Sequence, residues 1–230
     1  MTELELARRA AAAQAVKLIR DGYTVGLGSG ATMALAVREI AALLKGRSSD
    51  VCFVPTSHQI ELVALSLGLK LVSLSEHPEL DLSLDSADEV DDALNLIKGG
   101  GAAMTREKIV ASVSKRFVVI VDEHKRVRKL RRPVPIEVLP FAYPAVKRRV
   151  EVEGGRATIR EGEGKVGPVI TDNGNFVIDA DFGIIEKPAE LEKLFDSIPG
   201  IVESGLFVNM ADEVYVGKLD GTVELVRRMS

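Results

Sequence analysis

The sequence contains no tryptophan, and aromatic residues make up only 4% of its 230 residues. A protein that binds single-stranded nucleic acid by stacking bases usually carries more aromatic surface. The net charge is −4, whereas proteins that bind the phosphate backbone non-specifically are rich in Lys and Arg. Two local basic runs, residues 125–132 and 147–149, are interpreted as solvated faces. These shortages argue against a nucleic-acid partner.

Cysteine and long apolar runs are also scarce. The single cysteine, Cys52, excludes an intrachain disulfide and is typical of a reducing cytosol. Because it lies in the apolar run 51–54, we predict a small buried hydrophobe rather than a nucleophile. No stretch approaches the ~18 continuous apolar residues of a membrane span, and the first ten residues mix acids and arginines, unlike a signal peptide. We therefore expect a cytoplasmic protein with no membrane partner.

The composition is that of an ordinary globular protein, with 46% hydrophobic and 28% charged residues. Short apolar runs, each predicted to be a strand, alternate with helical patterns over the first half of the chain. The predicted strands are residues 23–27, 51–54, 69–74, 80–84, 94–97 and 117–121. The predicted helices are residues 2–20, 31–44, 59–67 and 105–114. This alternation predicts an α/β fold with a largely parallel sheet and helices on both faces.

The pattern changes after Lys129. The segment 132–135 contains two prolines and is predicted to be a stiff connector, because each proline fixes its own φ and restricts the preceding residue. Short strands and helices follow, with a tight turn at 172–175. We predict a catalytic α/β domain from residues 1–131 plus 205–230, and a smaller α+β domain from residues 132–204.

Polar or glycine-rich residues follow three of the predicted strands, at 28–32, 55–57 and 85–88. In parallel sheets, ligands bind beyond the carboxyl ends of the strands. Residues 26–31 match the dinucleotide pattern G-x-G-x-x-G/A, but the acid expected after the second strand is missing, which disfavours a nicotinamide cofactor. The hydroxyls and amides of Ser29, Gly30 and Thr32 instead suit a phosphate. A tight turn without a ligand remains an alternative.

Residues 85–108 concentrate the remaining chemistry. Asp85 and Asp88 could belong to a metal cluster, but the acids do not have the spacing of a calcium loop and the three histidines are scattered. Proton transfer by these carboxylates near Lys98 is therefore preferred, with a surface acidic turn as the alternative. Lys98 precedes three glycines and could stabilise an oxyanion. From spacing alone, Glu107 is predicted to be an exposed helical residue.

Eight motifs, in order over nearly the whole chain, resemble the type A family of ribose-5-phosphate isomerases: GLGSGAT, PTS, DSADEVD, KGGGAAMTREK, VDEHK, PIEVLPFA, TDNGN and GIVESGLF. The resemblance implies an open, Rossmann-like α/β domain with a smaller ferredoxin-like α+β domain. It also implies a homo-oligomer, dimer or tetramer, without a metal or an organic cofactor. The implied reaction interconverts ribose 5-phosphate and ribulose 5-phosphate through an enediolate, in the pentose phosphate pathway.

The resemblance also assigns roles to residues of this chain. Glu107 would be the general base, with Asp85, Asp88 and Lys98 as further catalytic groups. The implied substrate-binding residues are Ser29, Gly30, Ala31, Thr32, Asp85, Ser86, Ala87, Asp88, Lys98, Gly99, Gly100, Gly101 and Lys125. Two positions depart from the family pattern. Ser86 replaces a glycine and would be strained if its φ were positive, and Ala31 replaces a residue that often carries a hydroxyl.

Two other functions remain open on the sequence. A sugar-phosphate-binding regulatory module could share this kind of fold, although the first predicted helix leads directly into the first strand and leaves no room for a helix-turn-helix. A CoA-transferase-like enzyme would use a glutamate nucleophile, and the Lys98 and glycine context argues against it.

Overall fold

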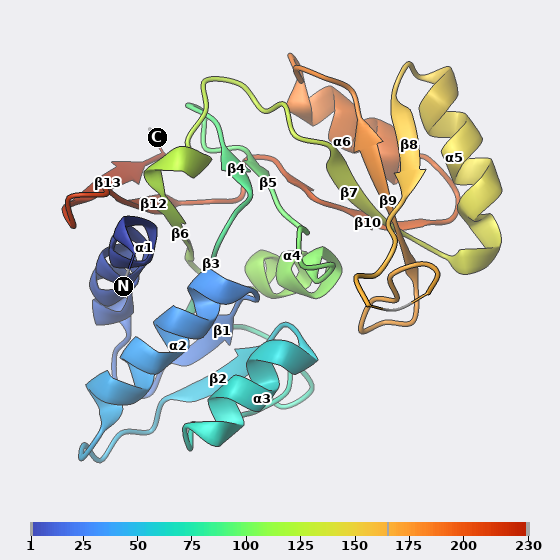
Figure 1. Ribbon diagram of the computed structural model, residues 1–230. Coiled ribbons are helices and arrows are strands. Elements are labelled where there is room, and N and C mark those ends of the chain that lie inside the picture. The colour runs from blue at the N-terminus through green and yellow to red at the C-terminus, as the bar shows by residue number, and fades with distance from the viewer. Residues whose placement is uncertain (1, 165, 229–230) are drawn as a thin grey trace. The chain divides into compact units, whose positions relative to one another are not determined.

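The computed structural model describes residues 2–164 and 166–228, and these residues form two compact units (Figure 1). The first unit runs to Ala87 and also contains Arg106–Arg126 and the residues from Met210 onward. The second unit contains Asp88–Thr105 and Val127–Asn209. This division differs from the predicted domain ranges chiefly at residues 88–105, which belong to the second unit. The domain ranges also include Met1, Lys165, Met229 and Ser230, which lie outside the described residues.

A six-stranded sheet forms the centre of the first unit, in the order β13-β12-β6-β3-β1-β2. Its strands are β1 (Thr24–Leu27), β2 (Cys52–Pro55), β3 (Leu82–Asp85), β6 (Phe117–Asp122), β12 (Glu213–Gly217) and β13 (Val223–Arg227). All neighbours pair in parallel except β13, which runs antiparallel to β12. The predicted α/β class with a largely parallel sheet is therefore confirmed.

Helices cover both faces of this sheet. They are α1 (Glu3–Ala15), the short η1 (Val16–Leu18), α2 (Ala31–Leu44), α3 (His58–Ser66) and α4 (Met104–Ser112), the last belonging to the first unit from Arg106 onward. Val25 and Leu27 of β1 pack into one core cluster with α1, α2 and α3. The intervening Gly26 faces the opposite side, where an added Cβ would lie 2.3 Å from Val110 Cγ1 of α4. The alternation along the strand thus assigns one face to three helices and the other to α4.

Two predictions from the sequence are wrong. Residues 69–74 form no strand; the only pairing in this described segment is an isolated bridge from Leu71 to Phe53. The extended stretch ends because the Ser73 N–H donates to Glu76 Oε2 (2.9 Å) and closes a turn. The predicted connector is also wrong, since Val134–Val138 is the strand β7. Pro135 lies opposite Gly205, just beyond the partner strand β10 (Ile201–Ser204), and its carbonyl accepts from the Gly205 N–H (2.7 Å). The Gly205 carbonyl, which a Pro135 N–H would face, accepts from the Lys98 N–H instead (2.8 Å), so the missing N–H of Pro135 leaves no acceptor unpaired.

The second unit contains an antiparallel sheet in the order β10-β7-β9-β8. The remaining strands of this sheet are β8 (Arg156–Ile159) and β9 (Phe176–Asp181), and its helices are α5 (Tyr143–Val152) and α6 (Pro188–Asp196), with a short turn η3 (Pro140–Ala142) before α5. The chain order β7-α5-β8-β9-α6-β10 is the ferredoxin-like β-α-β-β-α-β arrangement. A separate three-stranded sheet joins β4 (Glu89–Val90), β5 (Leu96–Ile97) and β11 (Leu206–Phe207).

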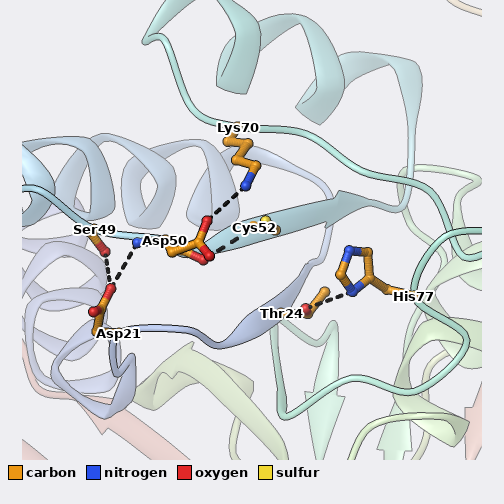
Figure 2. A network of polar contacts seen from close by, with 7 residues as sticks. All are labelled: Asp21, Thr24, Ser49, Asp50, Cys52, Lys70 and His77. Atoms are coloured by element: carbon orange, nitrogen blue, oxygen red, sulfur yellow. Dashed lines mark hydrogen bonds and ion pairs between the residues drawn. The ribbon is translucent and has the colours of Figure 1, made fainter.

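Polar contacts fix the loops at the amino ends of β1 and β2 (Figure 2). Asp21 Oδ1 accepts from Ser49 Oγ (3.0 Å) and from the Asp50 N–H (2.8 Å), and these bonds lower the pKa of Asp21. Lys70 Nζ donates to Asp50 Oδ1 (2.8 Å), which raises the pKa of Lys70. Cys52 lies beside this network and is buried, as predicted. Among the described residues, no helix is both long and apolar enough to cross a membrane.

Candidate active site

The carboxyl edge of the six-stranded sheet gathers polar residues from four strands. Ser29 follows β1, Thr56 follows β2, Asp85 ends β3, and Lys125 lies in the short helix η2 (Glu123–Lys125) after β6. These four strands are parallel and adjacent, in the order β6-β3-β1-β2, so their carboxyl ends share one edge. The edge is where ligands bind in sheets of this kind.

Three buried hydroxyls fix the loop after β1. Ser29 Oγ lies 2.8 Å from Thr56 Oγ1 and donates to Ser57 Oγ (2.6 Å). Thr56 Oγ1 in turn donates to the Leu27 carbonyl (2.9 Å). Because two strand ends are tied together in this way, the loop has a defined shape before any ligand arrives.

The loop leads into the amino end of α2. Gly30, the N-cap residue, has φ of +93°, a conformation that glycine adopts without strain. Its N–H donates to Gln59 Oε1 (3.0 Å), and no side chain caps the helix. The N–H groups of the first turn, from Ala31 and Thr32 onward, therefore carry the partial positive charge of the helix end, which favours an anion such as a phosphate.

Glu107 is buried, with only 5% of its surface exposed. The Ser29 N–H donates to its Oε1 (3.3 Å), so the carboxylate lies against the loop after β1. Its place in the first turn of α4 also favours a negative charge. The exposed helical glutamate that spacing alone predicts is therefore wrong. Burial follows from contact with a loop 78 residues away in sequence.

Asp85 is 2% exposed and requires a glycine opposite it. A Cβ added to Gly28 would lie 1.9 Å from Asp85 Oδ1. A Cβ on Gly26 would likewise clash with Val110. Close packing against Asp85 and Val110 therefore explains why glycine occupies both positions of the G-x-G pattern, without a bound dinucleotide. Asp85 Oδ1 also accepts from the neighbouring Ser86 N–H (2.7 Å).

The backbone conformation of Ser86 shows whether serine is strained at this position. Non-glycine residues with positive φ, among those described, are Leu94, Ala102 and Asn209. Ser86 is not one of them, so replacing the family's glycine by serine introduces no strain of this kind.

In the second unit, Lys98 follows β5 and is only 2% exposed. Its N–H donates to the Gly205 carbonyl (2.8 Å). Its Nζ lies 5.4 Å from the centroid of the Phe207 ring, at a distance that gives a favourable cation–π interaction. A buried ammonium held in this way is a preorganised positive charge.

The glycine loop that follows Lys98 is held by side chains on two sides. Gly100 N–H donates to Asp88 Oδ2 (2.8 Å). The carbonyls of Gly99 and Gly100 both accept from Arg160 Nη1, at 2.7 and 3.2 Å. Sequence reasoning did not select Arg160, Gln59 or Phe207, because their contacts join positions distant in the chain and no local motif marks them.

The structure thus divides the predicted site residues between the two units. The first unit brings together the loop 29–32, Asp85, Glu107 and the segment after β6 that carries Lys125. The second unit brings together Asp88, Lys98 and the glycine loop. In the described part of the chain, no group of three or more His, Cys, Asp or Glu side chains has the geometry of a metal site.

These features define a class of protein: an α/β protein with an uncapped helix end and buried carboxylates at the carboxyl edge of a parallel sheet. Comparison with known families is more specific. Residues 52–221 match the family described as ribose 5-phosphate isomerase A, or phosphoriboisomerase A. The chain belongs to the ribose 5-phosphate isomerase A family.

Several relatives are similar over nearly the whole of this chain. Ribose-5-phosphate isomerase A of Methanosarcina acetivorans is 46% identical over 221 residues, covering 96% of this chain and 94% of the relative. The human ribose-5-phosphate isomerase is 44% identical, covering 98% of this chain and 74% of the human protein. A solved D-ribose-5-phosphate isomerase in complex with phospho-erythronic acid has a TM-score of 0.94 at 43% identity, covering 98% of this chain and 99% of that chain.

Proposed function

We propose that this protein interconverts D-ribose 5-phosphate and D-ribulose 5-phosphate. Family membership supports this reaction, and so does the related structure that holds phospho-erythronic acid, a phosphorylated sugar acid. The observation that carries the proposal is the buried Glu107 carboxylate, held by the Ser29 N–H at the ligand-binding edge of the sheet. An aldose–ketose isomerisation needs such a base.

Glu107 is proposed as the general base. In its ionised form it takes the proton from C2 of the open-chain aldose, which gives an enediolate; the proton of the C2 hydroxyl passes to the oxygen on C1, and Glu107 returns its proton to C1. The same carboxyl group therefore ends the cycle ionised. Its position in the first turn of α4 and the Ser29 N–H both favour the charged form.

Lys98 is proposed to stabilise the negative oxygen of the enediolate. Its ammonium is buried and lies over the Phe207 ring, so it is held before the negative charge develops. A preorganised positive charge lowers the energy of the transition state more than a mobile one, because little reorganisation is required during the reaction.

Asp85 and Asp88 are proposed to orient the sugar hydroxyls and to exchange protons with them during ring opening. Asp85 is the first choice for the ring-opening step, since it is the deeply buried carboxylate at the end of β3. The proposed substrate-binding groups also include the acidic-loop residues Ser86 and Ala87 and the glycine loop from Gly99 to Gly101. The side chain of Lys125 is proposed to contact the substrate as well.

The amino end of α2 is proposed to bind the phosphate. Ser29, Gly30, Ala31 and Thr32 would supply amides and hydroxyls, and the uncapped first turn supports this role. We further propose that the protein acts in the cytoplasm, in the pentose phosphate pathway, as a homo-oligomer, dimer or tetramer. No cofactor is required in this mechanism, because protons alone are moved.

The proposed reaction is tested by measuring conversion of ribose 5-phosphate to the ketose. Purified protein is incubated with ribose 5-phosphate in the presence of EDTA, and formation of the ketose is followed by its absorbance. We expect conversion to the equilibrium mixture at an undiminished rate with EDTA. Binding of ribose 5-phosphate without conversion would instead favour a regulatory module, and loss of activity with EDTA would contradict the metal-free mechanism.

A further inference from the structure

The glycine loop is held from one side by a single guanidinium group. Arg160 Nη1 donates to the carbonyls of Gly99 (2.7 Å) and Gly100 (3.2 Å). The same side chain is fixed by Asp179, whose two carboxylate oxygens accept from Arg160 Nε (2.9 Å) and from Arg160 Nη2. All of these residues belong to the second unit. Two consecutive peptide carbonyls therefore point to one bidentate ion pair.

The direction of these carbonyls determines the direction of the next amides. In a planar trans peptide, the C=O of one residue and the N–H of the following residue point to opposite sides. With the Gly99 carbonyl on Arg160, the Gly100 N–H must point away from Arg160, and it donates to Asp88 Oδ2 (2.8 Å). With the Gly100 carbonyl also on Arg160, the Gly101 N–H is directed to that same opposite side.

Glycine peptides need such an external restraint. Gly99 has φ of +99°, and without a Cβ the loop can rotate its peptide planes at low cost. The only other backbone bond to the Gly99 carbonyl among those described is from Ala102 N–H (2.9 Å), which closes the turn but does not involve the Gly100 carbonyl. Arg160 is the side chain that binds both carbonyls at once.

We propose that Arg160, held by Asp179, is a positioning residue for the isomerase reaction. It directs the Gly101 N–H toward the substrate and, through the Gly100 N–H that donates to Asp88 Oδ2, positions the carboxylate of Asp88. Arg160 itself does not touch the substrate. This inference rests on the proposed function, since the glycine loop and Asp88 are proposed there as substrate-binding groups.

The chain offers a matched control on the same strand face. Arg156 lies four residues before Arg160 and pairs with Asp181 (3.1 Å), just as Arg160 pairs with Asp179 on the same neighbouring strand. Its side chain is 80% exposed, against 18% for Arg160. Arg156→Met therefore removes a similar ion pair from the same sheet without affecting the glycine loop.

The experiment compares Arg160→Met, Arg160→Lys and Arg156→Met in steady-state kinetics with ribose 5-phosphate. We expect KM to rise about tenfold in Arg160→Met with a smaller decrease in kcat, because the loss of one set of hydrogen bonds corresponds to about 1–1.5 kcal/mol. Arg160→Lys should have a KM between those of the wild type and Arg160→Met, since an ammonium group can reach one carbonyl but lacks the planar guanidinium fork that binds two. Arg156→Met should retain wild-type KM and kcat.

A second readout separates positioning from simple destabilisation. The affinity for phospho-erythronic acid, measured by calorimetry, should fall with the rise in KM. Millimolar guanidinium ion should partly restore KM in Arg160→Ala, whereas the wild-type KM expected for Arg156→Ala should not change when guanidinium is added. A role in stability alone would lower kcat through a smaller folded fraction and leave KM and the affinity unchanged, which would overturn the inference. Wild-type kinetics in folded Arg160→Met would also overturn it. If the wild-type protein converts no ribose 5-phosphate, the proposed function fails first, independently of Arg160.

Discussion

At the residue scale, the position of the Asp85 carboxylate depends on the absence of a side chain at Gly28. Asp85 occupies the space that a side chain on Gly28 would need, at 1.9 Å from the added Cβ. Glycine at position 28 is therefore required for the Asp85 carboxylate to occupy its observed position.

The first prediction concerns Gly28→Ala. The new methyl group should displace the Asp85 carboxylate, and a misplacement of about 1 Å can lower kcat by roughly a hundredfold. The matched control is Gly26→Ala, whose Cβ would instead clash with Val110 on the other face of β1. Both variants should lose stability, on the order of 1–3 kcal/mol from overpacking. Only Gly28→Ala should lose activity per folded molecule, and equal losses in the two variants would contradict this account.

The residue scale is also where the sequence was least informative. Glu107 has the spacing of an exposed helical residue, yet it is buried because its carboxylate meets the Ser29 N–H from a distant loop. Only the family resemblance selected it. Arg160 was not selected at all, since its contacts with Gly99 and Gly100 cross 60 or more residues. Side-chain contacts of this range leave no periodic trace in the sequence.

At the scale of elements, the strand ends could be predicted well. Alternating apolar runs and helical patterns gave the parallel sheet, and the ordering of parallel strands brings Ser29, Thr56 and Asp85 to one edge. The errors have local causes. Residues 69–74 have the apolar composition of a strand, but the Ser73 turn ends them after a single bridge. Pro135 suggested a connector, and instead the chain places it where no N–H is needed.

The prediction at the scale of elements concerns phosphate binding at the amino end of α2. Thr32 lies in the uncapped first turn, where its hydroxyl is proposed to bind the phosphate. Thr32→Val keeps the shape and removes the hydroxyl, so KM for ribose 5-phosphate should rise about tenfold, in line with the loss of a hydrogen bond to a charged group, with kcat less affected. Inhibition by inorganic phosphate should weaken in parallel. Thr158→Val, on an exposed position of β8, is the control; an unchanged KM in Thr32→Val would argue against phosphate binding here.

At the scale of the whole molecule, the family resemblance was the strongest information in the sequence. It covered nearly the whole chain, and the match over residues 52–221 together with the two kinds of unit confirms the family and the fold class. The predicted domain ranges differ from the two units of the structure chiefly at residues 88–105. Residues 88–105 belong to the second unit because β5 pairs with both β4 and β11 in a small sheet, and the β5–β11 pairing joins segments about 110 residues apart. Such pairing is not encoded in local patterns.

The whole account depends on Glu107 as the base that moves a proton between C2 and C1. The most direct test is Glu107→Gln, which keeps the size of the side chain and its acceptor for the Ser29 N–H. The control is Glu61→Gln on α3, where the glutamate side chain is 44% exposed. The measurements are kcat for ribose 5-phosphate and the dissociation constant of phospho-erythronic acid.

We predict that Glu107→Gln lowers kcat by roughly 10²–10⁴-fold, the usual contribution of a general base, while the dissociation constant changes only a few-fold and Glu61→Gln behaves like the wild type. Turnover near the wild-type rate in a folded Glu107→Gln protein would contradict the central claim.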